Sequence, residues 1–139
     1  MIDKFDGEYA FLSNFYECPV QYGFFTFSSS EAAFQSAKTT DETLIKKFVL
    51  LNPSAAKKLG RKMPLRKDWE QIKDTVMYQI VLNKFRQNLN LREKLLATGN
   101  EELVEGNWWN DTYWGRCNGV GKNKLGKILM EVRKELRST

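Results

Sequence analysis

Two side chains capable of acid–base or nucleophilic chemistry, Glu31 and Lys38, recur at helical spacing in this sequence together with the amide of Gln35. Ser29 comes just before them, and serine is a favoured helix N-cap, so the sequence predicts a helix over residues 29–38. At about 100° per residue, the three side chains fall within roughly 60° of one another on that helix. One face would therefore present a carboxylate, an amide and an amine in a row.

The simpler interpretation of this row is a solvated helix face with a weak attraction between Glu31 and Lys38. Two observations favour a site instead. The neighbouring sequence is aromatic rather than charged, so we expect the row to face protein rather than open water. The chain also contains no histidine, so acid–base chemistry must come from carboxylates, lysine or tyrosine.

A second candidate region, residues 107–115, holds three of the four tryptophans of the chain and also Asp111. Indole rings such as those of Trp109 and Trp114 stack on nucleobases, and this stacking is worth roughly 1–3 kcal/mol per base. Apolar neighbours would also sharpen the electric field of the Asp111 carboxylate. A packed aromatic cluster in which Asp111 caps a turn explains the same residues equally well.

Two basic stretches could bind a phosphate. Residues 119–124 combine glycines and lysines ahead of the last predicted helix, where free backbone N–H groups would suit an anion. A glycine turn followed by Asn123 as a helix N-cap is the alternative there. Arg61 follows a helix-ending glycine within a basic cluster, and it could clamp a phosphate, although a solvated surface is the default interpretation.

The composition indicates one globular domain. The chain has 139 residues, of which 42% are hydrophobic and 28% charged. The net charge of +5 and the pI near 9.2 favour an anionic partner, such as a phosphorylated ligand or nucleic acid. No apolar run approaches the roughly 20 residues of a membrane-spanning helix, so we expect no membrane partner.

The residue types also argue against several classes of site. Without histidine and with only two cysteines, a zinc site is not expected, and Ser-His-Asp or Cys-His catalysis is excluded. We expect neither a metal nor a cofactor. Cys18 and Cys117 lie far apart in the sequence, and we interpret both as reduced thiols of a cytoplasmic protein.

Hydrophobic periodicity and turn residues predict a single α+β domain over residues 1–139, mostly helical, with a small antiparallel sheet built from the N-terminal strands. The predicted hairpin joins residues 20–22 and 24–27 around a glycine. The other expected elements are helices over 41–51, 53–59, 69–87, 91–98 and from about 123, a short strand over 101–105 and a loop over 106–121.

Several stretches, which together span nearly the whole chain, resemble the NADAR, or YbiA-like, family in the same order. They are residues 7–16, 29–38, 56–61, 84–85, 95–99, 105–115 and 121–130. The chain departs from the family at Ala32, where histidine is frequent, and at Asn110, where glycine is frequent. Both departures bear on the choice of substrate more than on the reaction.

The resemblance implies a YbiA-like fold and an N-glycosidase that acts on a ribosylated, phosphate-bearing substrate. Family activities include removal of ADP-ribose from guanine and hydrolysis of early riboflavin-pathway intermediates. We expect the former, on a free nucleotide or on ADP-ribosylated nucleic acid, because the chain is basic. Hydrolysis of a ribosylaminopyrimidine phosphate and catalytically idle binding of ADP-ribose or NAD are the alternatives, with a basic nucleic-acid-binding module as a weaker one.

The resemblance also implies the site residues. Glu31 and Asp111 would stabilise the positive charge on the ribose and protonate the leaving base, with the assignment between them open. Lys38 could instead attack the sugar carbon and hold the opened ribose as a Schiff base. The residues expected to bind substrate are Asn14, Phe15, Ser29, Gln35, Arg61, Trp109, Trp114, Gly115 and Asn123.

Overall fold

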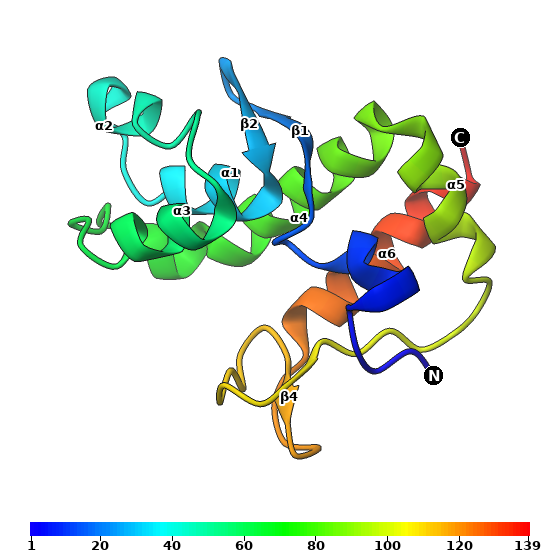
Figure 1. Ribbon diagram of the computed structural model, residues 1–139. Coiled ribbons are helices and arrows are strands. Elements are labelled where there is room, and N and C mark those ends of the chain that lie inside the picture. The colour runs from blue at the N-terminus through cyan, green and yellow to red at the C-terminus, as the bar shows by residue number, and fades with distance from the viewer. The chain divides into compact units, whose positions relative to one another are not determined.

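The computed structural model describes all 139 residues, and the chain forms two compact units. One unit combines Met1–Ser13 with Leu89–Thr139, and the other is Asn14–Asn88. The fold is α+β and mostly helical with a small antiparallel sheet, as the sequence predicts (Figure 1). A single domain over the whole chain stays a prediction. None of the helices combines the length and apolar character that crossing a lipid bilayer requires.

In the Asn14–Asn88 unit, the predicted hairpin is formed by β1 (Glu17–Tyr22) and β2 (Phe25–Ser29), which pair antiparallel. Tyr22 faces Phe25 across the ladder, so the connecting turn has only two residues. Its first residue, Gly23, has a φ of 62°, and a glycine in this position is what a type II′ turn requires.

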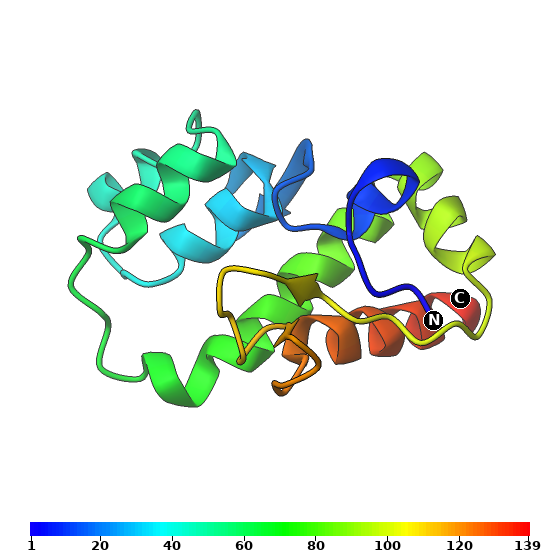
Figure 2. The ribbon, with the colours of Figure 1, turned by 60° about the horizontal axis from the view of Figure 1, so that its bottom comes forward.

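Behind the hairpin, α1 (Ser30–Ser36) packs against α3 (Pro53–Gly60) and α4 (Trp69–Gln87) (Figures 1 and 2). The bounds of α4 match the prediction. The core of this unit is apolar and consists mainly of side chains from β1, β2, α1 and α4, together with Phe48. The side chains from these elements include Val20, Phe27, Ala33, Phe34, Trp69, Met77, Ile80, Val81 and Phe85.

The predicted helix over 41–51 is too long. α2 covers only Glu42–Lys46. Beyond it the backbone bonds connect residues three apart, as in Phe48 N–H to Ile45 carbonyl (3.0 Å) and Val49 N–H to Lys46 carbonyl (3.2 Å). Such bonds tighten the chain into turns and do not extend an α-helix.

One charged side chain of α4 lies inside this unit. Lys84 is 1% exposed, and burial lowers its pKa to about 8. Its ammonium group lies 5.8 Å from the ring centroid of Tyr16 and 5.1 Å from that of Phe85. Aromatic faces attract cations, which offsets part of the cost of removing the charge from water.

The other unit contains the 3₁₀ helix η1 (Gly7–Leu12) and two helices that pack together, α5 (Leu89–Ala97) and α6 (Lys124–Arg137). Arg133 of α6 is 5% exposed and donates to the Thr98 hydroxyl and the Glu101 carbonyl, both at 2.9 Å. Leu91, Leu95, Leu103, Leu125, Leu129, Val132 and Leu136 supply most of the apolar core.

Two predictions for this unit need correction. The strand expected over 101–105 is reduced to an isolated bridge between Leu103 and Ile2. The segment expected to be loop over 106–121 contains two short parallel strands, β3 (Gly106–Asn107) and β4 (Arg116–Cys117). The bridge joins residues far apart in the sequence, and the β3–β4 ladder is only two residues long. Local periodicity reveals neither pairing.

Candidate active site

The start of α1 is held by hydrogen bonds to two residues. The Ser29 hydroxyl accepts from the backbone N–H of Ala32 at 3.1 Å, as expected for an N-cap. The carbonyl oxygen of Asn14 accepts from the N–H of Glu31 at 3.0 Å, and the Asn14 side chain accepts from the Ser30 hydroxyl at 3.1 Å. Asn14 and Ser29 therefore fix the position of Glu31, and their predicted role in substrate binding stays a prediction.

The polar row of α1 faces protein, as the aromatic neighbourhood indicated. Glu31 is 8% exposed and Gln35 is 6% exposed. The Gln35 amide donates to the Glu31 carboxylate at 2.7 Å, which orients one carboxylate oxygen. The other end of the amide, Oε1, is buried without a hydrogen-bond partner and lies so close to Gly60 that a methyl group there would overlap it.

The predicted helix over 29–38 is too long, because α1 ends at Ser36. Lys38 lies in the turn that follows α1 and is half-buried. Burial lowers the pKa of its amine, the charge of Glu31 opposes that shift, and the charge of Arg61 adds to it. Glu31 and Arg61 thus each lie within electrostatic range of Lys38 in this unit. A lowered pKa increases the neutral fraction of the amine, which is the nucleophilic form.

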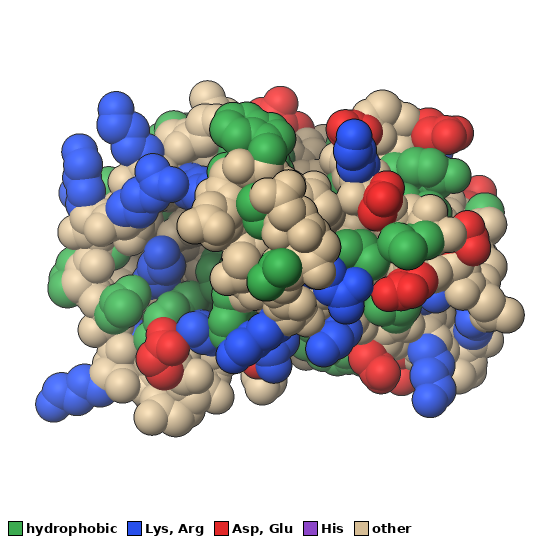
Figure 3. Space-filling model, turned by 90° about the horizontal axis from the view of Figure 1, so that it is seen from below, with side chains coloured by type: hydrophobic (Ala, Val, Ile, Leu, Met, Phe, Trp, Pro, Cys, Tyr) green, Lys and Arg blue, Asp and Glu red, His purple; other side chains and the backbone are tan.

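Positive charge gathers at the end of α3 beside this row. Lys57 and Lys58 occupy its last turn, and Arg61 is its exposed C-cap. The Lys57 ammonium lies 5.7 Å from the ring centroid of Phe15, which is 40% exposed. Figure 3 shows Lys and Arg side chains gathered toward the left of the face drawn there. An anionic group of a ligand would be stabilised beside these side chains.

In the loop of the other unit, Asp111 caps a turn. Its Oδ1 accepts from the backbone N–H groups of Tyr113 at 3.1 Å and Trp114 at 2.9 Å. The Asn107 side chain clasps the same turn, because it accepts from the Asp111 N–H at 3.0 Å and donates to the Asp111 carbonyl at 2.9 Å. The turn-capping interpretation of Asp111 is therefore correct, and its catalytic role stays a prediction.

The tryptophans of this loop do not form a closed aromatic core. Trp108 is 85% exposed and Trp109 is 47% exposed, with their rings edge to face at 5.6 Å. Trp114 instead packs edge to face against Tyr113 at 4.9 Å. An exposed indole such as that of Trp109 can stack on a planar ligand, whereas Trp114 is half-buried. The binding roles of Trp109 and Trp114 stay predictions.

A phosphate site at residues 119–124, one of the two interpretations of this stretch, would need free N–H groups at the start of α6, and these N–H groups are occupied. The backbone N–H groups of residues 122–125 donate to the carbonyl oxygens of residues 112–115 at 2.7–3.2 Å. The Asn123 side chain does not cap α6 but bonds the Glu105 N–H at 2.9 Å and the Leu103 carbonyl at 3.0 Å. Gly115 is required locally, because a side chain there would overlap the Glu105 carbonyl.

The structure therefore brings one group of predicted site residues together in the Asn14–Asn88 unit. This group contains Asn14, Phe15, Ser29, Glu31, Gln35, Lys38 and Arg61. The remaining predicted residues belong to the other unit, and their participation in the same site stays a prediction. They are Trp109, Asp111, Trp114, Gly115 and Asn123.

Sequence patterns did not reveal the contact of Gly60 with Gln35. The only local signal was a glycine at the end of a helix, which also has the ordinary explanation of helix termination. The contact depends on the packing of α1 against α3.

Comparison with known proteins decides the family. A sequence model of the NADAR domain matches residues 2–137 of the chain. The chain belongs to the NADAR family.

Among its NADAR relatives, N-glycosidase YbiA of Escherichia coli K12 is 41% identical over 133 residues, which cover 93% of this chain and 82% of that protein. The NMR structure of the E. coli protein YbiA superposes with a TM-score of 0.86 at 38% identity, covering 99% of this chain and 88% of the other. A riboflavin biosynthesis protein of Vibrio vulnificus is 40% identical over 136 residues, which cover 95% of this chain and 37% of that protein.

These matches confirm the resemblance and the fold class. The N-glycosidase names of the relatives also support the expectation that this NADAR chain is an enzyme of the N-glycosidase type.

Proposed function

We propose that this NADAR protein hydrolyses the N-glycosidic bond between guanine and ribose in ADP-ribosylated guanine. The observation that carries the proposal is the buried carboxylate of Glu31, held by Gln35 at 2.7 Å and within electrostatic range of Lys38. Cleavage of this bond builds positive charge on the ribose ring. A fixed carboxylate in a poorly solvated site stabilises that charge more strongly than it would in water.

Lys38 supports a covalent route. Its neutral amine would attack the anomeric carbon of the ribose while the electron pair of the breaking C–N bond leaves with the base. Opening of the sugar ring would then give a Schiff base, and water would release the sugar and return the amine. The departing base takes a proton, for which we propose Asp111 as the donor, with water as the alternative.

The phosphate groups of the substrate suit the basic end of α3. Burial is the main cause of the lowered Lys38 pKa, and the charge of Arg61 adds to it, which supports a place for Arg61 near the amine. A guanidinium binds phosphate through paired N–H donors. The net charge of +5 also favours a substrate with two phosphates or one carried on nucleic acid.

A second candidate substrate is a ribosylaminopyrimidine phosphate. The name of the Vibrio vulnificus relative, a riboflavin biosynthesis protein, supports it. The same carboxylate and amine would serve, because the bond that breaks again joins a ribose carbon to nitrogen.

Incubation with both substrates separates these proposals. We expect release of ADP-ribose from ADP-ribosylated guanine, free and in an oligonucleotide, and loss of that release in Glu31→Gln. Release of base only from the pyrimidine phosphate would support the second candidate. Tight binding of ADP-ribose or NAD without turnover of either substrate would contradict both and indicate a binding module.

A further inference from the structure

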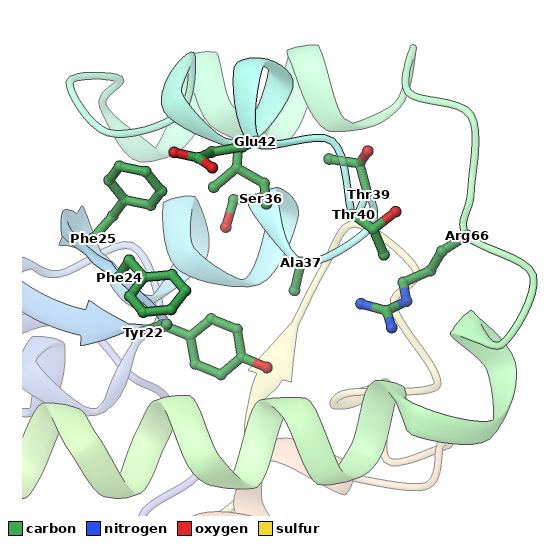
Figure 4. A pocket seen from close by; sticks show the side chains of 11 residues that line it. Tyr22, Phe24, Phe25, Ser36, Ala37, Thr39, Thr40, Glu42 and Arg66 are labelled. Atoms are coloured by element: carbon green, nitrogen blue, oxygen red, sulfur yellow. The ribbon is translucent and has the colours of Figure 1, made fainter.

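A separate cavity of about 250 Å³ lies within the Asn14–Asn88 unit (Figure 4). It is bounded by the hairpin turn, the end of α1, the start of α2 and the segment around Arg66. Ser36 contributes to it from α1 and stands about 140° around the helix from Glu31. None of the proposed catalytic residues lines it, so it is distinct from the candidate active site.

One side of the cavity is aromatic, formed by Tyr22, Phe24 and Phe25 (Figure 4). Phe24 is 96% exposed because the two-residue turn projects it from the hairpin. A phenyl ring that gains almost nothing from burial in the fold does not serve the core. Beside a cavity, it offers a flat surface on which a planar ring can stack.

A cationic side chain, that of Arg66, lines another side of the cavity. The Arg66 side chain points toward the cavity in Figure 4, and Asp68 holds its Nε at 2.6 Å and its Nη2 at 3.2 Å. That pairing orients the guanidinium and leaves Nη1 for another acceptor. The Arg66 backbone N–H donates to the Lys38 carbonyl at 2.8 Å, which anchors the segment to the end of α1.

An acid completes the set of polar groups. Glu42, at the start of α2, lines the cavity away from Arg66 in the view of Figure 4. It makes only a long ion pair, 3.7 Å, with Lys46, and both side chains are mostly exposed. A cavity with an aromatic side, a cation and a separate carboxylate suits a planar ring that carries N–H donors on one edge and an anion on a short linker.

We propose that this cavity binds a guanine nucleoside monophosphate, with the ring stacked on Phe24, the phosphate at Arg66 and the N–H edge of guanine at Glu42. Guanine presents two adjacent N–H donors on that edge, which match both oxygens of a carboxylate, whereas adenine presents only an amino group there. The proposal does not rest on the glycosidase activity, since its residues take no part in the proposed chemistry.

Calorimetric titration of the full chain with GMP tests the proposal. We expect wild type to bind GMP more tightly than AMP, guanosine or inorganic phosphate. Phe24→Ala should weaken GMP binding roughly tenfold through lost stacking. Arg66→Gln should reduce GMP binding to the level of guanosine, and Glu42→Gln should remove the preference for GMP over AMP.

Two matched variants serve as controls. Leu50 is 93% exposed and does not line the cavity, so Leu50→Ala should bind GMP as wild type does. Glu31→Gln should also bind GMP normally, although it lacks glycosidase activity. Absence of GMP binding to wild type at millimolar concentration would overturn the proposal. Unchanged GMP binding in Phe24→Ala would do so as well, and this variant removes only an exposed ring, so the fold should persist.

Discussion

Helix α1 and the loop over residues 107–115 both carry a carboxylate predicted to act in catalysis, but they use it differently. The Glu31 carboxylate accepts from a side-chain amide at 2.7 Å and is 8% exposed. The Asp111 carboxylate accepts from two backbone N–H groups of its own loop. At the start of α1, the Ser29 hydroxyl and the Asn14 carbonyl satisfy the backbone N–H groups, so the Glu31 carboxylate is not needed for that purpose.

The comparison shows at which positions a substitution can change the chemistry without changing the fold. A loop lacks the regular ladder of a helix, so side chains such as Asn107 and Asp111 must satisfy its backbone. Substitutions in the row of α1 should therefore change chemistry with little effect on the fold. Substitutions of Asp111 should change both, unless the new side chain can still accept the two backbone bonds.

The largest expected effect is that of Glu31→Gln. The amide keeps the shape of the side chain but removes the negative charge, so kcat/KM for ADP-ribosylated guanine should fall by about 10³-fold. The melting temperature should change little. Glu42→Gln in α2, outside the row, is the matched control and should retain activity. An activity of Glu31→Gln within tenfold of wild type would contradict the proposed role.

Lys38→Ala should lower kcat/KM by about 10²-fold and abolish a ribosyl adduct that borohydride traps on the wild type. Because burial lowers the Lys38 pKa below its usual 10.5, the neutral amine forms at lower pH than in an ordinary lysine. Where water protonates the leaving base, the rate should therefore rise with pH and level off below pH 10.5. An equal adduct on Lys38→Ala, or none on wild type, would remove the Schiff-base step. Lys47→Ala, which removes an exposed lysine outside the basic end of α3, serves as control.

Asp111→Asn tests the role of the carboxylate in the loop over residues 107–115. The asparagine carbonyl can still accept from Tyr113 and Trp114, so the melting temperature should stay close to that of wild type. If Asp111 donates the proton, activity should fall by about 10²-fold. Asp111→Ala should in addition lower the free energy of unfolding by about 1–3 kcal/mol. Full activity in Asp111→Asn would show that Asp111 caps the turn and does not donate the proton.

Gly60→Ala should disturb the row of α1 without touching any charged group. The new methyl group would overlap Gln35 Oε1, and displacement of that side chain would break its bond to Glu31. We expect a loss of about 1–3 kcal/mol in the free energy of unfolding and a several-fold loss of activity. Ala55→Gly, at a less buried position of the same helix, would report the helix effect with little loss of packing. Normal activity in Gly60→Ala would show that Gln35 does not position Glu31.

The smallest effect is expected for Trp108→Ala. The side chain is 85% exposed, so thermal unfolding should be unchanged. If Trp108 stacks on a neighbouring base, KM for an ADP-ribosylated oligonucleotide should rise roughly tenfold. KM for the free nucleotide substrate should stay the same. An equal rise for both substrates would show that the indole contacts the ADP-ribosyl group itself.

Features that depend on neighbouring residues could be predicted from the sequence. Ser29 as an N-cap, the glycine of the two-residue hairpin turn and the apolar repeat of α4 each act within a few residues. The polar row of α1 follows from helical spacing in the same way. The family resemblance added the functional class, which no local pattern specifies.

Tertiary structure decided which of these groups are available for chemistry. Asn14 bonds the N–H of Glu31, and Gly60 lies against Gln35, through contacts between segments separated along the chain. The N–H groups that a phosphate at the start of α6 would need donate instead to the carbonyl oxygens of residues 112–115. Residue types specify which hydrogen bonds a group can make, but packing selects the partner, because each donor and acceptor has many chemically equivalent choices.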